Sequence, residues 1–272
     1  MEEIRGEQVL EKIRNVKIQG ANEIAKAGIN LFTKNPTKDF AKKIISLRPT
    51  EPLLQNSLDI LVKTSKKNKT AKDLLDYIEK SKLAIAKAGS QLIKQDMNIF
   101  SHCHSTSVIE ILKYAKLKQK KNFVVYTLEV EPLLQGRQTA EELAKAGIKV
   151  IVFPDLAAEE ALRHCDVFFF GADAFTKKGV ANKLGTELLC RLARELNIPR
   201  YSCGVSLKYT KKLKIEYRSG KEVWDERSKN IQVINPAFDF TNKKYLSGVI
   251  SEFGILKFDD FVKKAKKTVN NF

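Results

Sequence analysis

The sequence predicts an α/β fold, with an N-terminal all-α helical domain over residues 1–97 followed by a Rossmann-like parallel-sheet domain over residues 98–272. Two observations lead to this prediction. Up to about residue 96, apolar residues recur at spacings of three and four, which is the pattern of amphipathic helices. Beyond residue 97, short runs rich in Val, Ile and Phe alternate with further helical patterns. Such alternation is typical of βαβ units, in which helices cover both faces of a parallel sheet.

Amphipathic helices are predicted throughout the N-terminal domain. They cover residues 20–34, 37–47, 51–66 and 70–93. Thr37 and Thr70 stand at the start of two of these segments, where a threonine can accept a hydrogen bond from a free backbone N–H group of the first turn. We therefore expect both threonines to be N-caps.

Strands and helices alternate in the second domain. The strands are predicted over residues 97–102, 122–130, 149–154, 166–173 and 199–205, and the helices over residues 108–118, 139–147, 157–164 and 180–196. In an open parallel sheet, a ligand binds beyond the carboxyl ends of the strands. The polar residues that follow these strands are therefore the first candidates for a functional site.

Composition narrows the class of protein. The 272-residue chain has no apolar stretch near 18 residues and a charged start, so we expect a cytoplasmic protein rather than a membrane-spanning or secreted one. Its four scattered cysteines favour reduced thiols. The 49 Lys and Arg against 32 Asp and Glu give a net charge of +17, but the lysines are spread along amphipathic segments. This pattern favours solvated lysine faces over nucleic-acid binding.

The stretch NIFSHCHSTSVIEIL places Cys103 between a predicted strand and a predicted helix. A thiol beside a helix N-terminus gains from the positive end of the helix dipole, so we expect its pKa to be lowered and its thiolate to be accessible. Ser105, Thr106 and Ser107, with their free backbone N–H groups, form a candidate anion site.

Other roles for these cysteines are open. A lone cysteine is most often a buried, inert side chain. Zinc binding by His102 and His104 is disfavoured, because adjacent positions on a strand point in opposing directions and the sequence offers no second ligand pair, so no metal is expected. Cys190 lies within a predicted helix and is assigned to the core.

Asp173 follows the predicted strand that carries three phenylalanines. A carboxyl group at the end of such a strand is poorly solvated, so its neutral form is favoured and it could donate a proton. Cys103 and Asp173 together would be a base and an acid set apart by their environments. Capping of the next turn is the alternative role for Asp173.

Several turns carry residues that suit phosphate or hydroxyl groups. Glycines in them permit close approach of the backbone, and Arg48, Lys183 and Lys208 supply positive charge. The turns cover residues 19–22, 47–50, 133–140, 180–186, 206–209 and 235–240, and Gln135 is a candidate in the third. The sequence contains neither a G-x-G-x-x-G fingerprint nor a G-x-x-x-x-G-K-[ST] loop, so dinucleotide and P-loop sites are not predicted.

Four sequence motifs resemble those of a known superfamily and occur in the same order along the chain. They are SHCHSTS, EPLLQGRQTAEELAKAGI, GADAFTKKGVANKLGT and VINPAFDFTNKKYLSGVISEFGI, with weaker matches in IQGANEIAKAGI and LRPTEPLLQNSL. The superfamily joins methylthioribose-1-phosphate isomerase, archaeal ribose-1,5-bisphosphate isomerase and the regulatory α, β and δ subunits of translation initiation factor 2B. The RPT and SLKY motifs are most similar to those of the archaeal ribose-1,5-bisphosphate isomerases.

The resemblance implies roles for individual residues. The isomerases use a cysteine in an H-C motif as base and an aspartate in a G-A-D motif as acid, which implies these roles for Cys103 and Asp173. The regulatory subunits generally lack this pair, so its presence implies an enzyme. The substrate-binding residues carried over are Gln19, Gly20, Ala21, Asn22, Arg48, Ser105, Thr106, Ser107, Asn182, Lys183 and Lys208.

The implied activity is aldose–ketose isomerisation of ribose 1,5-bisphosphate to ribulose 1,5-bisphosphate, with no metal or organic cofactor. An archaeal source and a homo-oligomer, either a dimer or a hexamer, are also implied. The alternative is a regulatory subunit, similar to those of initiation factor 2B, that binds a nucleotide or sugar phosphate and a protein partner. Two departures favour this alternative: Gln19 stands where the isomerases have arginine, and Glu131 stands where a positive charge is usual.

Overall fold

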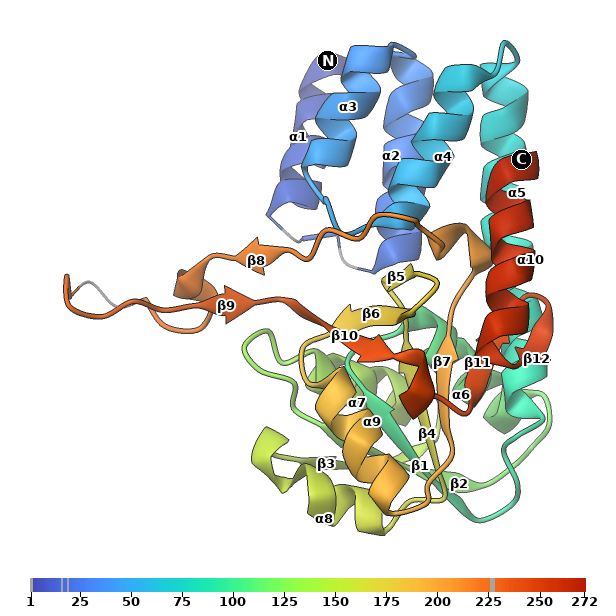
Figure 1. Cartoon of the computed structure of the whole chain (residues 1–272), viewed down its shortest axis with the longest axis vertical. Helices are drawn as coiled ribbons and strands as arrows, with labels where there is room; N and C mark the ends of the chain where they lie inside the picture. The colour runs from blue at the N-terminus through green and yellow to red at the C-terminus, as the bar shows by residue number, and fades with distance from the viewer. Residues whose placement is uncertain (1, 16, 19, 226–227) are drawn as a thin grey trace.

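The computed structural model describes residues 2–15, 17–18, 20–225 and 228–272. Figure 1 shows a layer of helices above a sheet that is itself flanked by helices. The predicted fold class is confirmed, because an N-terminal helical layer precedes a mostly parallel sheet. The division into two domains near residue 97 stays a prediction, since one hydrophobic cluster contains side chains from both parts of the chain.

The N-terminal layer follows the predicted helices closely. Its helices are α1 (Glu2–Arg14), α2 (Ala21–Lys34), α3 (Lys38–Ser46), α4 (Pro52–Lys63) and α5 (Lys67–Ser90). Thr37 caps α3 as predicted, and its hydroxyl accepts a hydrogen bond from the Phe40 backbone N–H at 3.2 Å. The prediction for Thr70 is wrong. The lysine-rich residues before Thr70 are good helix formers, so α5 begins at Lys67 and Thr70 lies inside its first turn.

In the described residues, the central sheet has seven strands in the order β12-β11-β7-β4-β1-β2-β3, and every neighbouring pair is parallel except β11 with β12. The strands are β1 (Met97–His102), β2 (Phe123–Leu128), β3 (Lys149–Phe153), β4 (Val167–Gly171), β7 (Arg200–Cys203), β11 (Gly248–Ser251) and β12 (Gly254–Leu256). The predicted strands correspond to the first five of these. Chain progression reverses between β1 and β4, and a ligand crevice is expected at such a switch point.

The sheet is covered on both faces. The covering helices are α6 (Thr106–Leu117), α7 (Gln135–Lys145), α8 (Ala158–Arg163), α9 (Thr186–Glu195) and α10 (Phe258–Asn271). Because side chains alternate along a strand, Phe169 packs in the cluster with α6, while Phe168 and Phe170 pack in the cluster with α8, α9 and α10. Cys190 is fully buried in this second cluster, as predicted for a core residue.

The predicted helix over residues 180–196 is wrong at its start. Its first residues form β6 (Gly179–Lys183), which pairs antiparallel with β5 (Ala174–Phe175) and β10 (Phe238–Asn242). Every residue of β6 is buried, so tertiary contacts decide its conformation and a short run of this kind does not distinguish strand from helix. Gly185, with a φ of 98°, then turns the chain into α9.

A two-stranded arm extends from the body of the molecule (Figure 1). Its strands are β8 (Tyr217–Arg218) and β9 (Asn235–Pro236), which pair antiparallel. Large apolar side chains are exposed along it, namely Tyr217, Val223, Trp224, Ile231 and Ile234. A lone two-stranded ribbon has no apolar layer with which to bury such side chains, so the arm presents an uncovered apolar surface.

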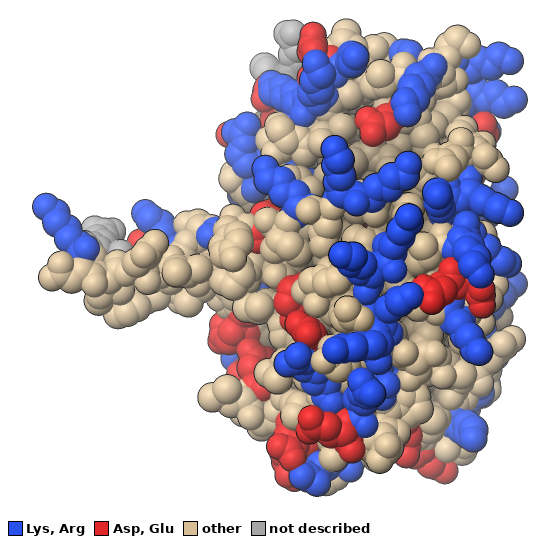
Figure 2. Space-filling model, viewed as in Figure 1, with Lys and Arg blue, Asp and Glu red and all other residues tan. Residues whose placement is uncertain are grey.

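Charged side chains are distributed over the rest of the surface. Figure 2 shows Lys and Arg spread from the helical layer down to the sheet, with Asp and Glu among them. This distribution is consistent with the solvated lysine faces that the sequence predicts. Of the helices in the described ranges, none combines the length and apolar character needed to cross a membrane.

Candidate active site

A cavity lies between the carboxyl ends of β1 and β4 and the starts of α2 and α4. The predicted candidates that line it are Gly20, Ala21, Asn22, Arg48, Cys103, Ser105, Thr106, Ser107, Gln135, Asp173, Asn182, Lys183 and Lys208. Gln19, the remaining candidate, lies outside the described residues. The structure thus brings the described candidates to one cavity, and their roles there stay predictions.

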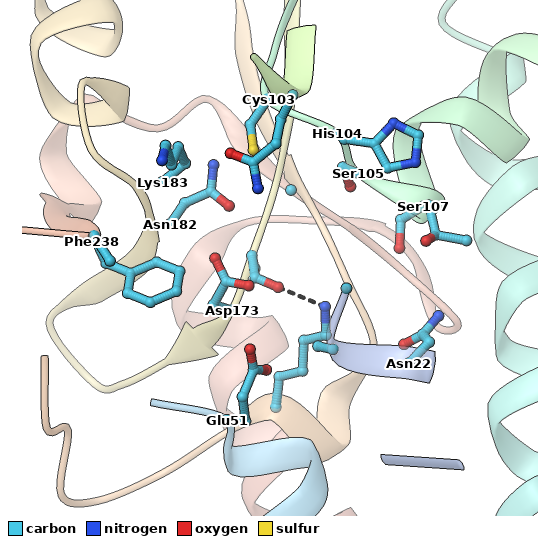
Figure 3. A pocket seen from close by; sticks show the side chains of 18 of the residues that line it. Asn22, Glu51, Cys103, His104, Ser105, Ser107, Asp173, Asn182, Lys183 and Phe238 are labelled. Carbon is cyan, nitrogen blue, oxygen red and sulfur yellow. Dashed lines mark hydrogen bonds between the residues drawn. The ribbon is translucent and has the colours of Figure 1, made fainter. Parts of the chain in front are cut away.

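Cys103 directly follows β1, and its side chain lies at one side of the cavity (Figure 3). Its φ of 65° falls in the left-handed region that residues other than glycine seldom adopt. Thr139 Oγ1 supports this turn by donating a hydrogen bond to the Cys103 carbonyl at 3.0 Å. Ser105 ends the turn as the N-cap of α6, where its hydroxyl accepts from the Val108 N–H. Such backbone strain persists where surrounding contacts hold it, and it is frequent at functional sites.

The prediction of a lowered pKa for Cys103 is wrong in this structure. Burial first, and then the neighbouring Asp173 charge, raise the pKa of the thiol to about 12. Lys183 and the His104 backbone N–H act in the opposite direction without offsetting burial. The helix contributes little because α6 begins at Thr106, beyond the residue that carries the thiol. Cys103 therefore holds its proton at neutral pH and needs an acceptor before it can act as a base.

Asp173 lies just beyond β4, across the cavity from Cys103 (Figure 3). Its backbone N–H donates to the Ala181 carbonyl at 2.9 Å, which fixes the turn between β4 and β6. Burial raises the pKa of the Asp173 carboxyl, while the Lys208 and Arg48 charges lower it. The net shift is upward, as the apolar strand predicts, so this carboxyl group binds a proton more strongly than an exposed aspartate does.

Two buried lysines face the cavity. Lys208 ends the short helix η2 (Ser206–Lys208) and donates to the Ala172 carbonyl at 2.5 Å, the contact dashed in Figure 3. Lys183 ends β6 near Cys103, and burial lowers the pKa of both lysines. Their ammonium groups are poorly hydrated, so they can bind an anionic ligand at little further desolvation cost.

The N-termini of α2 and α6 meet at one side of the cavity. A Cβ atom added at Gly20, the N-cap of α2, would lie 3.7 Å from Thr106 Oγ1 at the start of α6. Asn22 and Ser107 lie at this side in Figure 3. Asn22 is 9% exposed, and its Oδ1 has no hydrogen-bond partner within the described residues. Because free N–H groups and dipole ends converge here, this side is suited to a phosphate group.

Two glycines permit close packing around the cavity. A Cβ atom at Gly171 would lie 2.7 Å from Ser105 Oγ, so the glycine allows the start of α6 to approach the end of β4. A Cβ atom at Gly136 would lie 1.6 Å from the Leu128 carbonyl oxygen, so α7 can begin directly against the end of β2. This places Gln135 at the cavity wall.

The two histidines that flank Cys103 have separate partners. His102 Nε2 lies 3.1 Å from the Leu184 carbonyl oxygen, and His104 Nδ1 lies 3.1 Å from Thr139 Oγ1. Burial lowers the pKa of His102 to about 4, so its imidazole is neutral at pH values above that. Across the described ranges, no group of three or more His, Cys, Asp and Glu side chains is placed to hold a metal ion.

Residues 7–258 match the Initiation factor 2 subunit family. The chain belongs to this family. Its relatives include a protein named ribose 1,5-bisphosphate isomerase from Methanocaldococcus jannaschii, which is 30% identical over 92% of this chain and 90% of the relative. A protein of the same name from Thermococcus kodakarensis is 31% identical, with 92% of this chain and 90% of the relative covered.

A solved structure in the family has the same fold. It is the translation initiation factor eIF-2B of Pyrococcus horikoshii OT3, which is 29% identical, with a TM-score of 0.84 over 93% of this chain and 97% of that one. The Initiation factor 2 subunit family thus contains relatives named as enzymes and a relative named as a translation factor, at comparable identity. Sequence identity alone therefore does not distinguish the two functions, and the residues in the cavity are the basis for choosing between them.

Some residues at the cavity of this Initiation factor 2 subunit family member were not predicted from the sequence. They are Glu51, His104, Gly171, Ala172 and Arg218, whereas Leu133, Ala237 and Phe238 lie in two of the predicted turns. Glu51 stands three residues after Arg48 at the start of a helix, a spacing that could have indicated their ion pair. Arg218 comes from the arm, and only the tertiary fold connects that segment to the cavity.

Proposed function

We propose that the protein is an aldose–ketose isomerase that converts ribose 1,5-bisphosphate to ribulose 1,5-bisphosphate. The observation that carries the proposal is the position of Cys103 and Asp173, which face one cavity from the ends of the adjacent strands β1 and β4. The names of the archaeal relatives support the same reaction. An archaeal source and a cytoplasmic location are part of the proposal.

The substrate contacts two sides of the cavity. The phosphate on the anomeric oxygen lies at the N-termini of α2 and α6, where Ser105, Thr106 and Ser107 provide N–H and hydroxyl donors. Lys183 and Lys208 provide charge for the remaining polar groups and the second phosphate. Gln19 stands where the isomerases have arginine, so one bidentate contact to phosphate is lost. The two lysines partly offset this loss.

Chemistry begins with transfer of the Cys103 thiol proton to the Asp173 carboxylate, which produces a thiolate and a carboxylic acid together. Asp173 then donates its proton to the ring oxygen as the bond from that oxygen to C1 breaks, and the thiolate removes the proton from C2. Cys103 returns that proton to C1, and Asp173 recovers one from the C2 hydroxyl as the ketone forms. Protons and electrons balance, so the cycle is a net isomerisation.

The direct test is to incubate the purified protein with α-ribose 1,5-bisphosphate and follow ribulose 1,5-bisphosphate by NMR. We expect the aldose signals to decrease and those of the ketose to increase until the equilibrium ratio is reached. Binding without any conversion would contradict the proposed substrate, and methylthioribose 1-phosphate would then be assayed in the same way.

The regulatory alternative has one specific observation in its favour, the likeness to the P. horikoshii initiation factor. The sequence departure at Glu131 no longer supports this alternative. Glu131 is exposed and is not among the residues that line the cavity, and its backbone N–H donates to Asp155 Oδ2 at 2.8 Å. A regulatory subunit would bind a sugar phosphate or nucleotide in the same cavity without turning it over.

Assembly into a homo-oligomer is also part of the proposal, because a second copy can cover the apolar side chains of the arm. Trp224 is 56% exposed there, and Arg218 connects the arm to the cavity. We expect Trp224→Ser to shift the protein toward a smaller species in light scattering after size exclusion. Leu156→Ser, at an exposed leucine outside the arm, is the matched control. An unchanged mass for Trp224→Ser would contradict the role of the arm in assembly.

A further inference from the structure

The short helix η2 carries Lys208 into the cavity but contributes little to holding it there. Within this turn, the Lys208 N–H donates to the Val205 carbonyl at 3.1 Å and the Tyr209 N–H donates to the Ser206 carbonyl at 2.9 Å. A single turn of 3₁₀ helix has poor hydrogen-bond geometry, so it does not fix its own position. The place of the Lys208 ammonium group therefore depends on contacts from outside η2.

Asn56 on α4 bridges the carbonyl groups of the two residues that flank Lys208. Its Nδ2 donates to the Leu207 carbonyl at 2.6 Å and to the Tyr209 carbonyl at 2.9 Å. Both partners are acceptors, so only the nitrogen of the amide can face them. Because one amide group uses both of its N–H donors here, it fixes the backbone on either side of Lys208 and with it the direction in which that side chain leaves the backbone.

Glu252 holds the other end of η2 from the turn between β11 and β12. Both of its carboxylate oxygens accept from the Ser206 N–H, at 3.0 and 3.1 Å. The hydroxyl of Tyr77, on α5, donates to Glu252 Oε1 at 2.5 Å, and it lies 3.0 Å from Ser206 Oγ. The first N–H of a helix has no partner within the helix, and a carboxylate accepts from it strongly. The start of η2 is thus tied to the sheet and to the helical layer.

The ammonium group of Lys208 is the functional end of this arrangement. Its Nζ donates to the carbonyl of Ala172, the residue directly before Asp173 (Figure 3). Lys208 is only 7% exposed. Burial raises the pKa of the Asp173 carboxyl, and Lys208 is the charge that opposes this rise most. Lys208 thereby favours the Asp173 carboxylate, which is the form that accepts the Cys103 proton in the proposed mechanism.

We propose that Asn56 is a positioning residue for Lys208, and that Glu252 and Tyr77 fix the opposite end of the same turn. This inference rests on the proposed isomerase function for its kinetic meaning, whereas the placement of Lys208 is a property of the protein without substrate. The described residues that line the cavity include Lys208 but not Asn56, Glu252 or Tyr77. These side chains therefore act through Lys208 and do not touch the sugar.

The first test measures the placement of Lys208 without substrate. The full-length protein is labelled at neutral pH with a trace of acetic anhydride, and mass spectrometry of its peptides gives the labelling rate of each lysine. Asn56→Leu keeps the size of the side chain and removes both N–H donors. We expect Lys208 to be labelled several-fold faster in this variant, because its ammonium group is no longer held in a buried place that the reagent seldom reaches.

Lys183 is the internal control for the labelling, since it is the other buried lysine of the cavity and comes from β6. Its rate should stay at the wild-type value in Asn56→Leu. An unchanged or slower rate for Lys208 would overturn the proposal whether or not the protein is an isomerase. Faster labelling of both lysines would indicate a general opening of the cavity, and it would overturn the proposal as well.

Asn98→Leu is the matched control variant. Asn98 Nδ2 also donates to a backbone carbonyl, that of His164 at 2.8 Å, but Asn98 lies near the start of β1, at the end of the strand away from Cys103. This variant should keep the wild-type labelling rate of Lys208, and an increase as large as that in Asn56→Leu would contradict a specific role for Asn56.

Tyr77→Phe keeps the test decisive if Asn56→Leu does not fold. It removes only the hydroxyl that contacts Glu252 and Ser206, so Lys208 should be labelled faster than in the wild type, by a smaller factor than in Asn56→Leu. A wild-type rate in Tyr77→Phe would overturn the part of the proposal that concerns Glu252 and Tyr77.

Once activity is established, a double-mutant cycle shows whether Asn56 acts through Lys208. Asn56→Leu should raise the KM for ribose 1,5-bisphosphate roughly tenfold, because a charged contact to the substrate is misplaced. In a Lys208→Met background, the same change should have little further effect on KM. A purely structural role predicts a lower kcat from a smaller folded fraction, with KM unchanged in both backgrounds, and that result would contradict positioning.

Discussion

Replacing Cys103 with serine is expected to lower kcat for ribose 1,5-bisphosphate by a factor on the order of 10²–10⁴ or more. A serine hydroxyl is a much weaker acid than a thiol, so it does not give up its proton to the Asp173 carboxylate and cannot form the anion that removes the proton from C2. The side chains have nearly the same size, and the phosphate contacts at the starts of α2 and α6 come from other residues. Substrate affinity, measured by calorimetry, should therefore survive while turnover measured by NMR is lost.

Cys165→Ser is the matched control for this substitution. Cys165 is a buried cysteine outside the cavity lining, and its Sγ donates to the Ala161 carbonyl at 3.2 Å, a contact that a serine hydroxyl can also make. This variant should retain wild-type turnover. Retained turnover in Cys103→Ser would remove the base from the proposed mechanism, and loss of both turnover and binding would indicate a misfolded cavity.

The ends of β1 and β4 could be predicted from the sequence because two physical rules coincide there. The apolar runs of the strands alternate with amphipathic helices, and ligands bind beyond the carboxyl ends of parallel strands. Cys103 and Asp173 follow those two strands, so the sequence alone predicts that both belong to one site. The upward shift of the Asp173 pKa was predictable for the same reason, since three phenylalanines precede it.

The properties that were missed depend on distant parts of the chain. The direction of the Cys103 pKa shift was wrong because burial outweighs a helix dipole that begins beyond the thiol, and burial is not visible in a local motif. β6 was read as helix because its conformation comes from pairing with β10, more than 50 residues later. Glu51 was not predicted because its place at the cavity depends on the tertiary fold.

Replacing Asp173 with asparagine is expected to lower kcat by a factor on the order of 10²–10⁴, because an amide can neither accept the Cys103 proton nor protonate the ring oxygen. The backbone contact to Ala181 remains, so the turn after β4 is retained. Asp166→Asn is the matched control, since Asp166 precedes the same strand and accepts from the Asn98 N–H at 2.8 Å, a contact that an asparagine oxygen preserves. Full turnover in Asp173→Asn would contradict its role as the acid.

The same substitution should make the protein more stable at neutral pH. The pKa of Asp173 is raised in the folded protein, so the stability that its protonated form contributes is complete below the pKa of the unfolded chain and is lost as the pH rises through the folded value. Asparagine does not ionise, and Asp173→Asn should therefore melt close to wild type at about pH 4. At neutral pH it should melt above the wild type, because it avoids the cost of ionising a buried carboxyl group. A variant that melts below the wild type at neutral pH would show that Lys208 and Arg48 stabilise the Asp173 carboxylate more than burial destabilises it. A gain in stability together with a loss of turnover is the result expected for a carboxyl group that is retained for catalysis.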